Sequence, residues 1–365
     1  MDNWTRIGPT NTPTRTRYNE TPNYAEGLYD LGNKLYAWMV PNGSWGESNA
    51  GLIVGDGEAL LVDTLWDLNY TRGMLSAMRP LLDANPLKYV VNTHADGDHF
   101  WGNECVADKE IISSQACYDE MLNTKPASLL LLGRVGKALS LLGKLPGLGD
   151  WGKIGHWFQN MVAPYEFQAV TPTRPSRTFK GELTLNVGGR EVQLIEIGPM
   201  HTHGDLMVYV PDAKTLYSAD ALFIGSTPVI WAGPVENWLA ALDKILTMDV
   251  ETIIPGHGPI TDKEGVREVK AYWVYVADEV RKRYEAGMSA RDAAYDIVLS
   301  NDFAQQPFAN WNSPERIMVS THTIYRHLAG RTDTPKVPEL LNTMRKQALL
   351  AHELPNAQPS MMRKT

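Results

Sequence analysis

The chain has 365 residues, 43% of them hydrophobic, so it can bury a large core as one α/β domain with additions or as two smaller domains. A net charge of −8 without any Lys/Arg run argues against a nucleic-acid partner, because phosphate binding needs a basic face. Cys105 and Cys117 are the only cysteines, which excludes a disulfide framework and a four-cysteine metal site within one chain.

The first segment, residues 1–24, is expected to form an extended N-terminal arm. It is rich in Thr, Pro, Asn and Arg and lacks the apolar core of a signal peptide. A cytoplasmic location is therefore expected.

The next segment alternates strand and helix patterns. A turn at Gly55-Asp56-Gly57 divides two strands, and the run Ala59–Val62 is apolar throughout, as in a strand buried on both faces. The elements predicted here are strands at Lys34–Val40, Ala50–Asp63 and Tyr89–Val91 and a helix at Leu68–Leu82. The segment His94–His99 follows the last of these strands, in a loop at a strand tip, where functional sites on such sheets usually lie.

Residues 113–168 show no strand-like alternation and are expected to be a helical insertion. Its apolar residues recur at helical spacing, at Leu131, Val135, Ala138, Leu139, Leu142 and Leu145, which predicts one apolar face. Arg134 and Lys137 interrupt the run, so stable membrane insertion is not expected. The sequence does not decide between a lid over a site and an insertion that packs on the core.

Strands resume after the insertion, and helices then continue to the end of the chain. The predicted elements are strands at Glu182–Val187 and Glu191–Ile197, a hairpin of Met207–Val210 with Thr215–Ser218, a helix at Val235–Leu246 and a strand at Thr252–Ile254. Residues 263–365 are expected to form a C-terminal helical extension, in which Ser289 with Asp292 predicts a capping box and Ser313-Pro314 predicts a helix start. Whether these helical additions form a homo-oligomer is not decided by the sequence.

Four separate segments place metal-type ligands directly after an apolar strand. In chain order these ligands are His94, Asp96, Asp98 and His99, then His201, then Asp220, then His257. A single histidine in a Gly-rich loop is more often structural, so it is the joint occurrence that indicates a metal site.

In this order the segments strongly resemble the metallo-β-lactamase superfamily, from about Gly51 to Pro259. The motifs that carry the resemblance are Leu61–Thr64, Thr93–His99 with Gly102-Asn103, Gly198–Asp205, Tyr217–Asp220 and Pro255–Gly258. The resemblance implies an α/β fold, an αββα sandwich over residues 25–262, with the insertion and the C-terminal helices outside the matched pattern.

The resemblance also implies the role of each ligand. His94 and His201 would bind a first metal, Asp98, His99 and His257 a second, and Asp220 would bridge the two. Asp63 would hold a ligand loop or a histidine in place, or would simply cap its strand end. His201, directly before Thr202, matches the ligand position better than His203, which is left as a candidate for proton transfer or substrate contact.

Asp96 departs from the family pattern, which usually has a second histidine there. The added carboxylate oxygen makes the ligands of the first site chemically harder. Iron and manganese are therefore alternatives to zinc, which is the expected metal. A glutamate stands at this position in di-iron members such as flavodiiron proteins and a di-iron β-hydroxylase of antibiotic biosynthesis. Three arrangements are open: Asp96 ligates a shifted metal, it acts through a water, or the first site is empty and one metal binds.

The expected activity is hydrolysis of a small, fairly hydrophobic substrate such as an ester, lactone, thioester, amide or activated aromatic carbon. One or two divalent cations would turn a bound water into hydroxide near neutral pH, and Asp98 would orient it. A di-iron oxygenase is the alternative, and a degenerate binding module is the third interpretation. Trp151, Trp157, Phe158 and the stretch Phe223–Trp231 are candidates for an aromatic pocket, or equally for core or a dimer interface.

Overall fold

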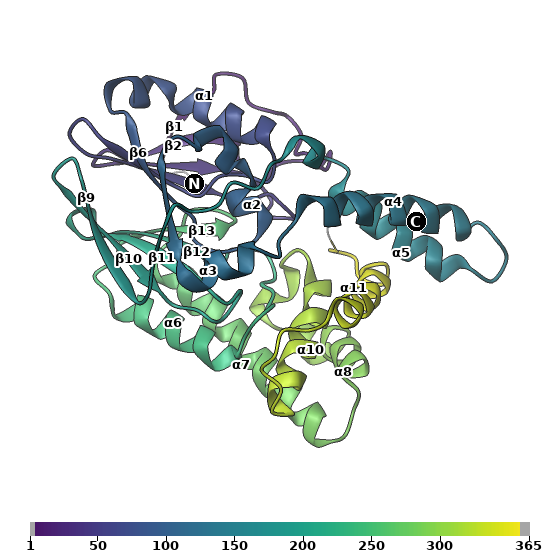
Figure 1. Ribbon diagram of the computed structural model, residues 1–365. Helices are drawn as coiled ribbons and strands as arrows, with labels where there is room; N and C mark the ends of the chain where they lie inside the picture. Colours follow the sequence, from purple (N-terminus) through teal and green to yellow (C-terminus); the bar gives the residue numbers. More distant parts are fainter. Residues whose placement is uncertain (1–3, 358–365) are drawn as a thin grey trace.

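The computed structural model describes residues 4–357, in which two β-sheets pack face to face between helices (Figure 1). Residues 1–3 of the predicted arm and residues 358–365 of the predicted C-terminal extension lie outside the described part. The predicted αββα sandwich with a helical C-terminal extension is confirmed.

The first sheet has eight strands in chain order, β1 to β8. They are β1 Thr5–Gly8, β2 Gly27–Gly32, β3 Leu35–Met39, β4 Ala50–Val54, β5 Ala59–Val62, β6 Leu87–Val91, β7 Glu110–Ser114 and β8 Arg177–Phe179. The strands pair antiparallel from β1 to β5 and parallel from β5 to β8. The first residues of the predicted arm therefore include an edge strand, and Ser113 and Ser114 of the predicted insertion belong to β7.

The second sheet has five strands in the order β13-β12-β11-β10-β9. They are β9 Glu182–Val187, β10 Arg190–Glu196, β11 Leu206–Val210, β12 Thr215–Phe223 and β13 Thr252–His257. The predicted hairpin is confirmed, with Val208 opposite Tyr217 and Val210 opposite Thr215. Strand β13 joins β12 in parallel, through the crossover helix α6, Val235–Thr247.

Three apolar layers hold these elements together. Between the sheets, residues such as Leu60 and Val91 pack against Val192 and Val208. The outer face of the first sheet packs on α1, Leu68–Ala84, through Met74 and its neighbours. The outer face of the second sheet is covered by α6 and by α7, Lys263–Glu285 (Figure 1). Because side chains alternate between the two faces of each strand, both faces of each sheet are apolar, which accounts for the stacking order helix, sheet, sheet, helix.

The insertion forms three helices, α3 Gln115–Met121, α4 Pro126–Leu142 and α5 Gly149–Val162. Helices α4 and α5 form a hairpin that projects from the sandwich (Figure 1). The predicted apolar face of α4 does not pack on the core, because Leu131, Val135, Leu142 and Leu145 are exposed. Helix α4 instead approaches α5 through Gly136, whose missing side chain would lie within 3 Å of the α5 backbone.

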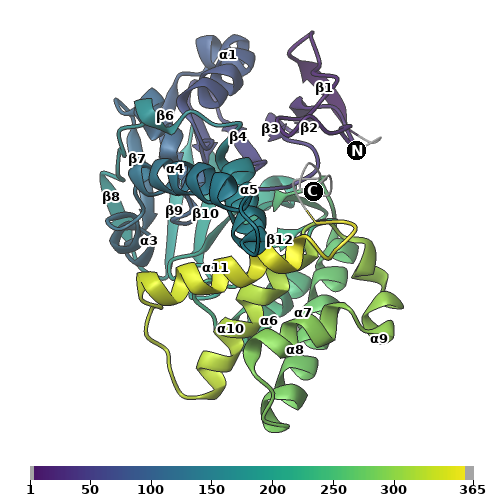
Figure 2. The ribbon, with the colours of Figure 1, turned by 90° about the vertical axis from the view of Figure 1, so that its right-hand side faces the viewer.

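The C-terminal helices lie beside the second sheet and reach back to the insertion (Figure 2). After α7 they are α8 Ala290–Val298, α9 Asn301–Ala304, α10 Ile317–Leu328 and α11 Val337–Ala351. The predicted capping box is confirmed, since the Ser289 hydroxyl accepts the Asp292 backbone N–H. Helix α11 packs on α5, where the His352 ring bonds the Lys153 carbonyl. No helix within residues 4–357 is long and apolar enough to cross a membrane.

Candidate metal centre

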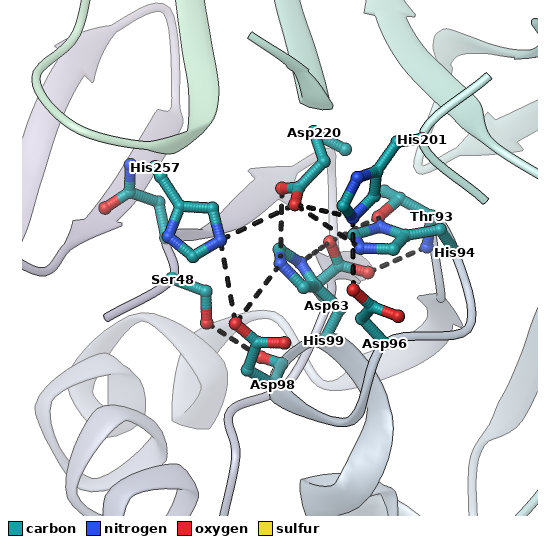
Figure 3. Close-up of polar contacts among 12 residues, drawn as sticks. Ser48, Asp63, Thr93, His94, Asp96, Asp98, His99, His201, Asp220 and His257 are labelled. Atoms are coloured by element: carbon teal, nitrogen blue, oxygen red, sulfur yellow. Dashed lines mark hydrogen bonds and ion pairs between the residues drawn. The ribbon is translucent and has the colours of Figure 1, made fainter. Parts of the chain in front are cut away.

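The structure brings the seven predicted ligands together in one cluster, in which Asp96 is half-buried (Figure 3). Within each of three groups, the candidate ligand atoms lie within 4.8 Å of one another. The groups are His94, His99 and Asp220, then His94, Asp96 and His201, then Asp98, His99 and His257. Loops and strand ends from both sheets therefore supply one site, as their positions after apolar strands predict.

Asp220 lies at the middle of the cluster, on the buried strand β12. One carboxylate oxygen, Oδ2, is 3.2 Å from His201 Nε2 and 3.5 Å from His257 Nε2, and Oδ1 is 3.3 Å from His99 Nε2. Gly256 makes room for this carboxylate, because a Cβ at that position would lie 1.8 Å from Oδ1. The bridging role of Asp220 stays a prediction, and this central placement supports it.

Asp63, at the end of β5, orients two of the histidines. Its Oδ1 accepts the Thr93 backbone N–H at 2.8 Å, and its Oδ2 lies 2.7 Å from the Thr93 hydroxyl and 2.9 Å from His99 Nδ1. Since a carboxylate only accepts, both groups donate to it, and the Thr93 hydroxyl is left to accept from His94 Nδ1 at 3.0 Å. One carboxylate thus orients both rings through Nδ1, so that Nε2 of each faces the centre, where a cation would bind it.

The loop that carries His201 is held by Asp205, a residue to which the sequence analysis assigned no role. Its carboxylate accepts the backbone N–H groups of Met200 and Thr202. Burial raises the pKa of Asp205 to about 7. The His201 ring donates from Nδ1 to the Val229 carbonyl at 2.7 Å, which leaves Nε2 facing the cluster.

His257 ends strand β13 and is oriented by the segment before β4. Its Nδ1 donates to the Glu47 carbonyl at 3.1 Å, and its Nε2 lies 3.6 Å from Asp98 Oδ2. The neighbouring Ser48 hydroxyl donates to the Asp98 carbonyl at 2.8 Å. The ring also stacks on Phe223, with centroids 4.8 Å apart. The Glu47 carbonyl and the Phe223 ring thereby fix the imidazole with its Nε2 facing the cluster.

Unpaired buried atoms show that the cluster fits a metal. Among the described residues, His94 Nε2, His99 Nε2 and Asp220 Oδ1 are buried without a hydrogen-bond partner. Buried polar atoms are rarely left unsatisfied, and all three of these converge on the same centre. A cluster of imidazole and carboxylate groups suits divalent metal ions such as zinc, iron or manganese.

Burial and mutual contacts also shift the pKa values of the ligands. Burial, with the neighbouring His99, holds the pKa of His94 well below its usual value, so its ring is in the neutral form that binds a cation. Burial alone would raise the pKa of Asp220, but the surrounding imidazoles, His257 first, hold it well below the usual range. Asp220 is therefore ionised across the physiological pH range.

Asp96, the residue that departs from the family pattern, lies with His94 and His201, the predicted ligands of the first metal. Its Oδ2 is 3.1 Å from His201 Nε2 and 3.2 Å from Trp231 Nε1, which donates to it. The short side chain therefore reaches the atoms that would bind the first metal. Direct ligation by Asp96 stays a prediction, and this geometry supports it.

His203 stands apart from the other predicted site residues. Its ring Nδ1 is 3.0 Å from a carboxylate oxygen of Glu120 on α3, and its backbone N–H donates to the other oxygen. This contact raises the pKa of His203. The residue is not among those that line the cavity over the metal centre, so the structure gives it an anchoring contact to α3.

A cavity of about 250 Å³ opens over the cluster. Its walls carry seven large apolar side chains and one buried cation, Arg316. The apolar lining residues are Trp45, Trp66, Trp101, Leu129, Phe223, Val229 and Trp231. The predicted aromatic pocket is thus present, with Phe223 and Trp231 in it. Of the other candidates, Trp157 and Phe158 lie in the core, and Trp151 is exposed on the hairpin.

Residues 43–257 match the metallo-beta-lactamase superfamily, a span that holds all seven ligands. The chain belongs to this superfamily. The match accounts for the order of the ligand segments and for the αββα fold, while the C-terminal helices lie beyond it.

Three curated relatives are enzymes of different kinds. The chain is 26% identical to a linear primary-alkylsulfatase of Pseudomonas sp. over 66% of its own length and 48% of that protein. It is 24% identical to the alpha subunit of a 2,4-dinitroanisole O-demethylase of Nocardioides sp., over 56% of this chain and 51% of that protein. It is also 24% identical to an acyl-coenzyme A thioesterase of Gallus gallus, over 64% of this chain and 75% of that protein. The chain spans about half the length of the first two.

A solved structure extends the likeness to the helical additions. The sec-alkylsulfatase of Pseudomonas sp. superposes with a TM-score of 0.60 at 16% identity, over 86% of this chain and 51% of that one. This superposition shows that the two share a fold.

Proposed function

We propose that this protein is a metal-dependent hydrolase that cleaves an ester of a small, apolar molecule carrying an anionic group. The observation that carries the proposal is the position of Arg316, a buried cation on the wall of the cavity that opens over the ligand cluster. Trp, Phe, Leu and Val side chains make up much of the wall beside the ligand cluster, so the cavity suits a molecule with one apolar and one anionic part.

Arg316 comes from the C-terminal extension, directly before α10, and only 2% of its surface is exposed. Its Nη1 donates to the Ser226 hydroxyl and to the Thr227 carbonyl, both at 3.1 Å, while its Nε has no hydrogen-bond partner among the described residues. The guanidinium carbon lies 4.9 Å from the ring centroid of Trp45. A guanidinium stays protonated even where burial lowers its pKa, so it can hold a planar or tetrahedral oxyanion by two donors.

The other cavity residues provide orientation and proton transfer. When bound, two divalent cations would supply Lewis-acid activation of the ester and lower the pKa of a water molecule. Asp98 lines the same cavity, and burial raises its pKa, which suits a group that receives the proton of the attacking water. Trp45, Trp66 and Trp101 would exclude bulk water from the apolar part of the substrate.

The relatives support this class of reaction without fixing the substrate. One is named a linear primary-alkylsulfatase, and an alkyl sulfate has an apolar alkyl chain and an anionic ester group. Another is a thioesterase. Because the chain covers only about half of the alkylsulfatase, an alkyl sulfate is our first substrate to test and not an inherited one.

Hydrolysis by the zinc-loaded enzyme tests the proposal. Octyl sulfate is followed in a pH-stat, and a neutral octanoate ester serves as the comparison substrate. We expect Arg316→Met to lower kcat/KM for octyl sulfate by about 30-fold, since a charge-assisted hydrogen bond is worth ~2 kcal/mol, and Arg316→Lys to recover part of it. The neutral ester should change less than about threefold. Equal losses on both esters, or no hydrolysis of either, would contradict the proposal.

Asp96 supports a second candidate, the di-iron oxygenase. With His94 and His201 it forms a set of two histidines and one carboxylate, which is typical of non-haem iron sites. Iron content of the purified protein, together with oxygen consumption driven by a chemical reductant, distinguishes this activity from hydrolysis. A degenerate binding module is disfavoured, because none of the ligand positions has lost its ligand-type side chain.

A further inference from the structure

The hairpin of α4 and α5 carries half of the large apolar side chains that are exposed in the described part of the chain. Twelve large apolar side chains are exposed within residues 4–357, and six of them lie on the hairpin, which makes up about a tenth of those residues. The six are Leu131, Val135, Leu141, Leu142, Leu145 and Trp151, with exposed fractions from 39% to 61%. Such clustering marks an interaction surface, while scattered exposed residues need no explanation.

Glycines in the hairpin explain why this surface faces outward. Gly136 of α4 and Gly155 of α5 lie so close that a Cβ on Gly155 would be 2.5 Å from the Gly136 carbonyl. Gly143 and Gly152 meet in the same way nearer the tip. The two helices therefore pack backbone to backbone, and the leucine side chains of α4 are not needed between them.

The exposed residues form a stripe along α4 that continues to the tip. At 100° per residue, Leu131, Val135, Ala138 and Leu142 fall within about 60° of arc, and Leu145 extends the stripe into the connecting loop. Helix α4 contains Arg134 and Lys137 and has no acidic residue. Surface-lying amphipathic helices combine apolar and basic residues in this way.

The charge of the hairpin is opposite to that of the rest of the chain. The hairpin, residues 126–162, contains four basic residues and one acidic residue, a net charge of +3, whereas the whole chain carries −8 and the remainder therefore −11. The four are Arg134, Lys137, Lys144 and Lys153, all exposed. A two-fold dimer through the stripe would bring two +3 surfaces together, so charge disfavours a second copy.

We propose that the hairpin docks on the surface of a lipid bilayer that contains anionic phospholipid. The apolar stripe and the tip residues Leu141, Leu145 and Trp151 would enter the head-group region, and the basic residues would contact the anionic head groups. The helix does not span the bilayer, in line with the absence of a spanning helix among the described residues. Because Leu129 at the start of α4 lines the cavity, docking would bring the cavity close to apolar molecules dissolved in the membrane.

Vesicle co-sedimentation tests this docking without reference to catalysis. The full-length protein is mixed with sucrose-loaded vesicles of phosphatidylcholine alone or with 30 mol% phosphatidylglycerol. We expect the anionic vesicles to bind at least tenfold more tightly, and the difference to shrink at high salt because the charge contribution is screened. Equal binding to both vesicles, or binding to neither, overturns the proposal.

Variants of the hairpin locate the surface. Leu141→Gln with Leu145→Gln should weaken binding to anionic vesicles at least tenfold, with an unchanged Tm because both side chains are exposed. The matched control carries Leu299→Gln with Val337→Gln, two exposed apolar residues elsewhere, and should bind like the wild type. Wild-type binding by the hairpin variant overturns the proposal. So does sedimentation equilibrium showing a dimer that this variant dissociates, because the occupant would then be a second copy.

Discussion

Replacing Asp63 by asparagine tests how far one carboxylate organises the metal centre. Asp63 has φ of 62°, in the left-handed region where asparagine is well tolerated, so Asp63→Asn keeps the backbone. The Thr93 backbone N–H can only donate, and therefore the asparagine oxygen must take the place of Oδ1. The amide nitrogen is then forced into the place of Oδ2, facing the Thr93 hydroxyl and His99 Nδ1.

The amide nitrogen in place of Oδ2 changes which tautomers of the two histidine ligands are favoured. An amide N–H facing His99 Nδ1 favours the tautomer with the proton on Nε2, the atom that would bind the metal, and the hydroxyl that held His94 is also reoriented. The lost charge-assisted hydrogen bond is worth about 1.5–3 kcal/mol, so metal affinity should fall by roughly 10- to 100-fold.

Competition with a chromophoric chelator measures this affinity. The matched control is Asp56→Asn, an exposed aspartate in the turn after β4 that should bind metal like the wild type. Thermal melting of the metal-free proteins verifies that both variants fold. A metal affinity of Asp63→Asn within threefold of the wild type would refute the reasoning about tautomers.

Three further predictions concern the ligand cluster and the C-terminal helices. Gly256→Ala should abolish metal binding in chelator competition, because its Cβ would displace the Asp220 carboxylate; stoichiometric binding by a folded variant would contradict this. Asp96→His should raise zinc occupancy, measured by elemental analysis, and unchanged occupancy would mean that Asp96 does not face the metal. Burial and the nearby Lys346 lower the pKa of His322 to about 4. The unfolded chain, in which the pKa of this histidine is about 6.5, therefore binds a proton between pH 6.5 and pH 4 that the folded chain does not bind, and the free energy of unfolding falls by up to about 3 kcal/mol as the pH drops through this range. His322→Gln should reduce the loss of Tm between pH 7.5 and 4.5. An unchanged loss would disprove the assignment.

Local patterns were enough to predict the framework of the site. Each ligand segment directly follows an apolar strand, so its place at a strand end could be predicted without knowing the fold. The turn at residues 55–57 and the hairpin before Asp220 were predicted for the same reason, because turn residues and alternation act over a few positions. Four strands, β1, β2, β7 and β8, were missed; their pairing depends on partners elsewhere in the chain.

Contacts between distant segments account for what the sequence did not reveal. Helical spacing predicted the apolar stripe of α4 but not its direction, which Gly136 and Gly155 decide through close packing. The helix start predicted at Ser313-Pro314 is present as a short 3-10 helix, Pro314–Arg316, but the Ser313 side chain does not cap it, because its backbone is left-handed and its hydroxyl donates to Asn312. Arg316 carried no motif, and only the fold brings it to the cavity, about 60 residues after the last ligand.

The metal content of the protein, purified without added metal and measured together with its absorption spectrum, tests the central claim most directly. We expect two zinc ions per chain, no visible absorption, and hydrolysis that is lost on chelation and restored by zinc. Two iron ions with an oxo-to-iron absorption band, or a protein that hydrolyses equally well without metal, would contradict the assignment as a metal-dependent hydrolase.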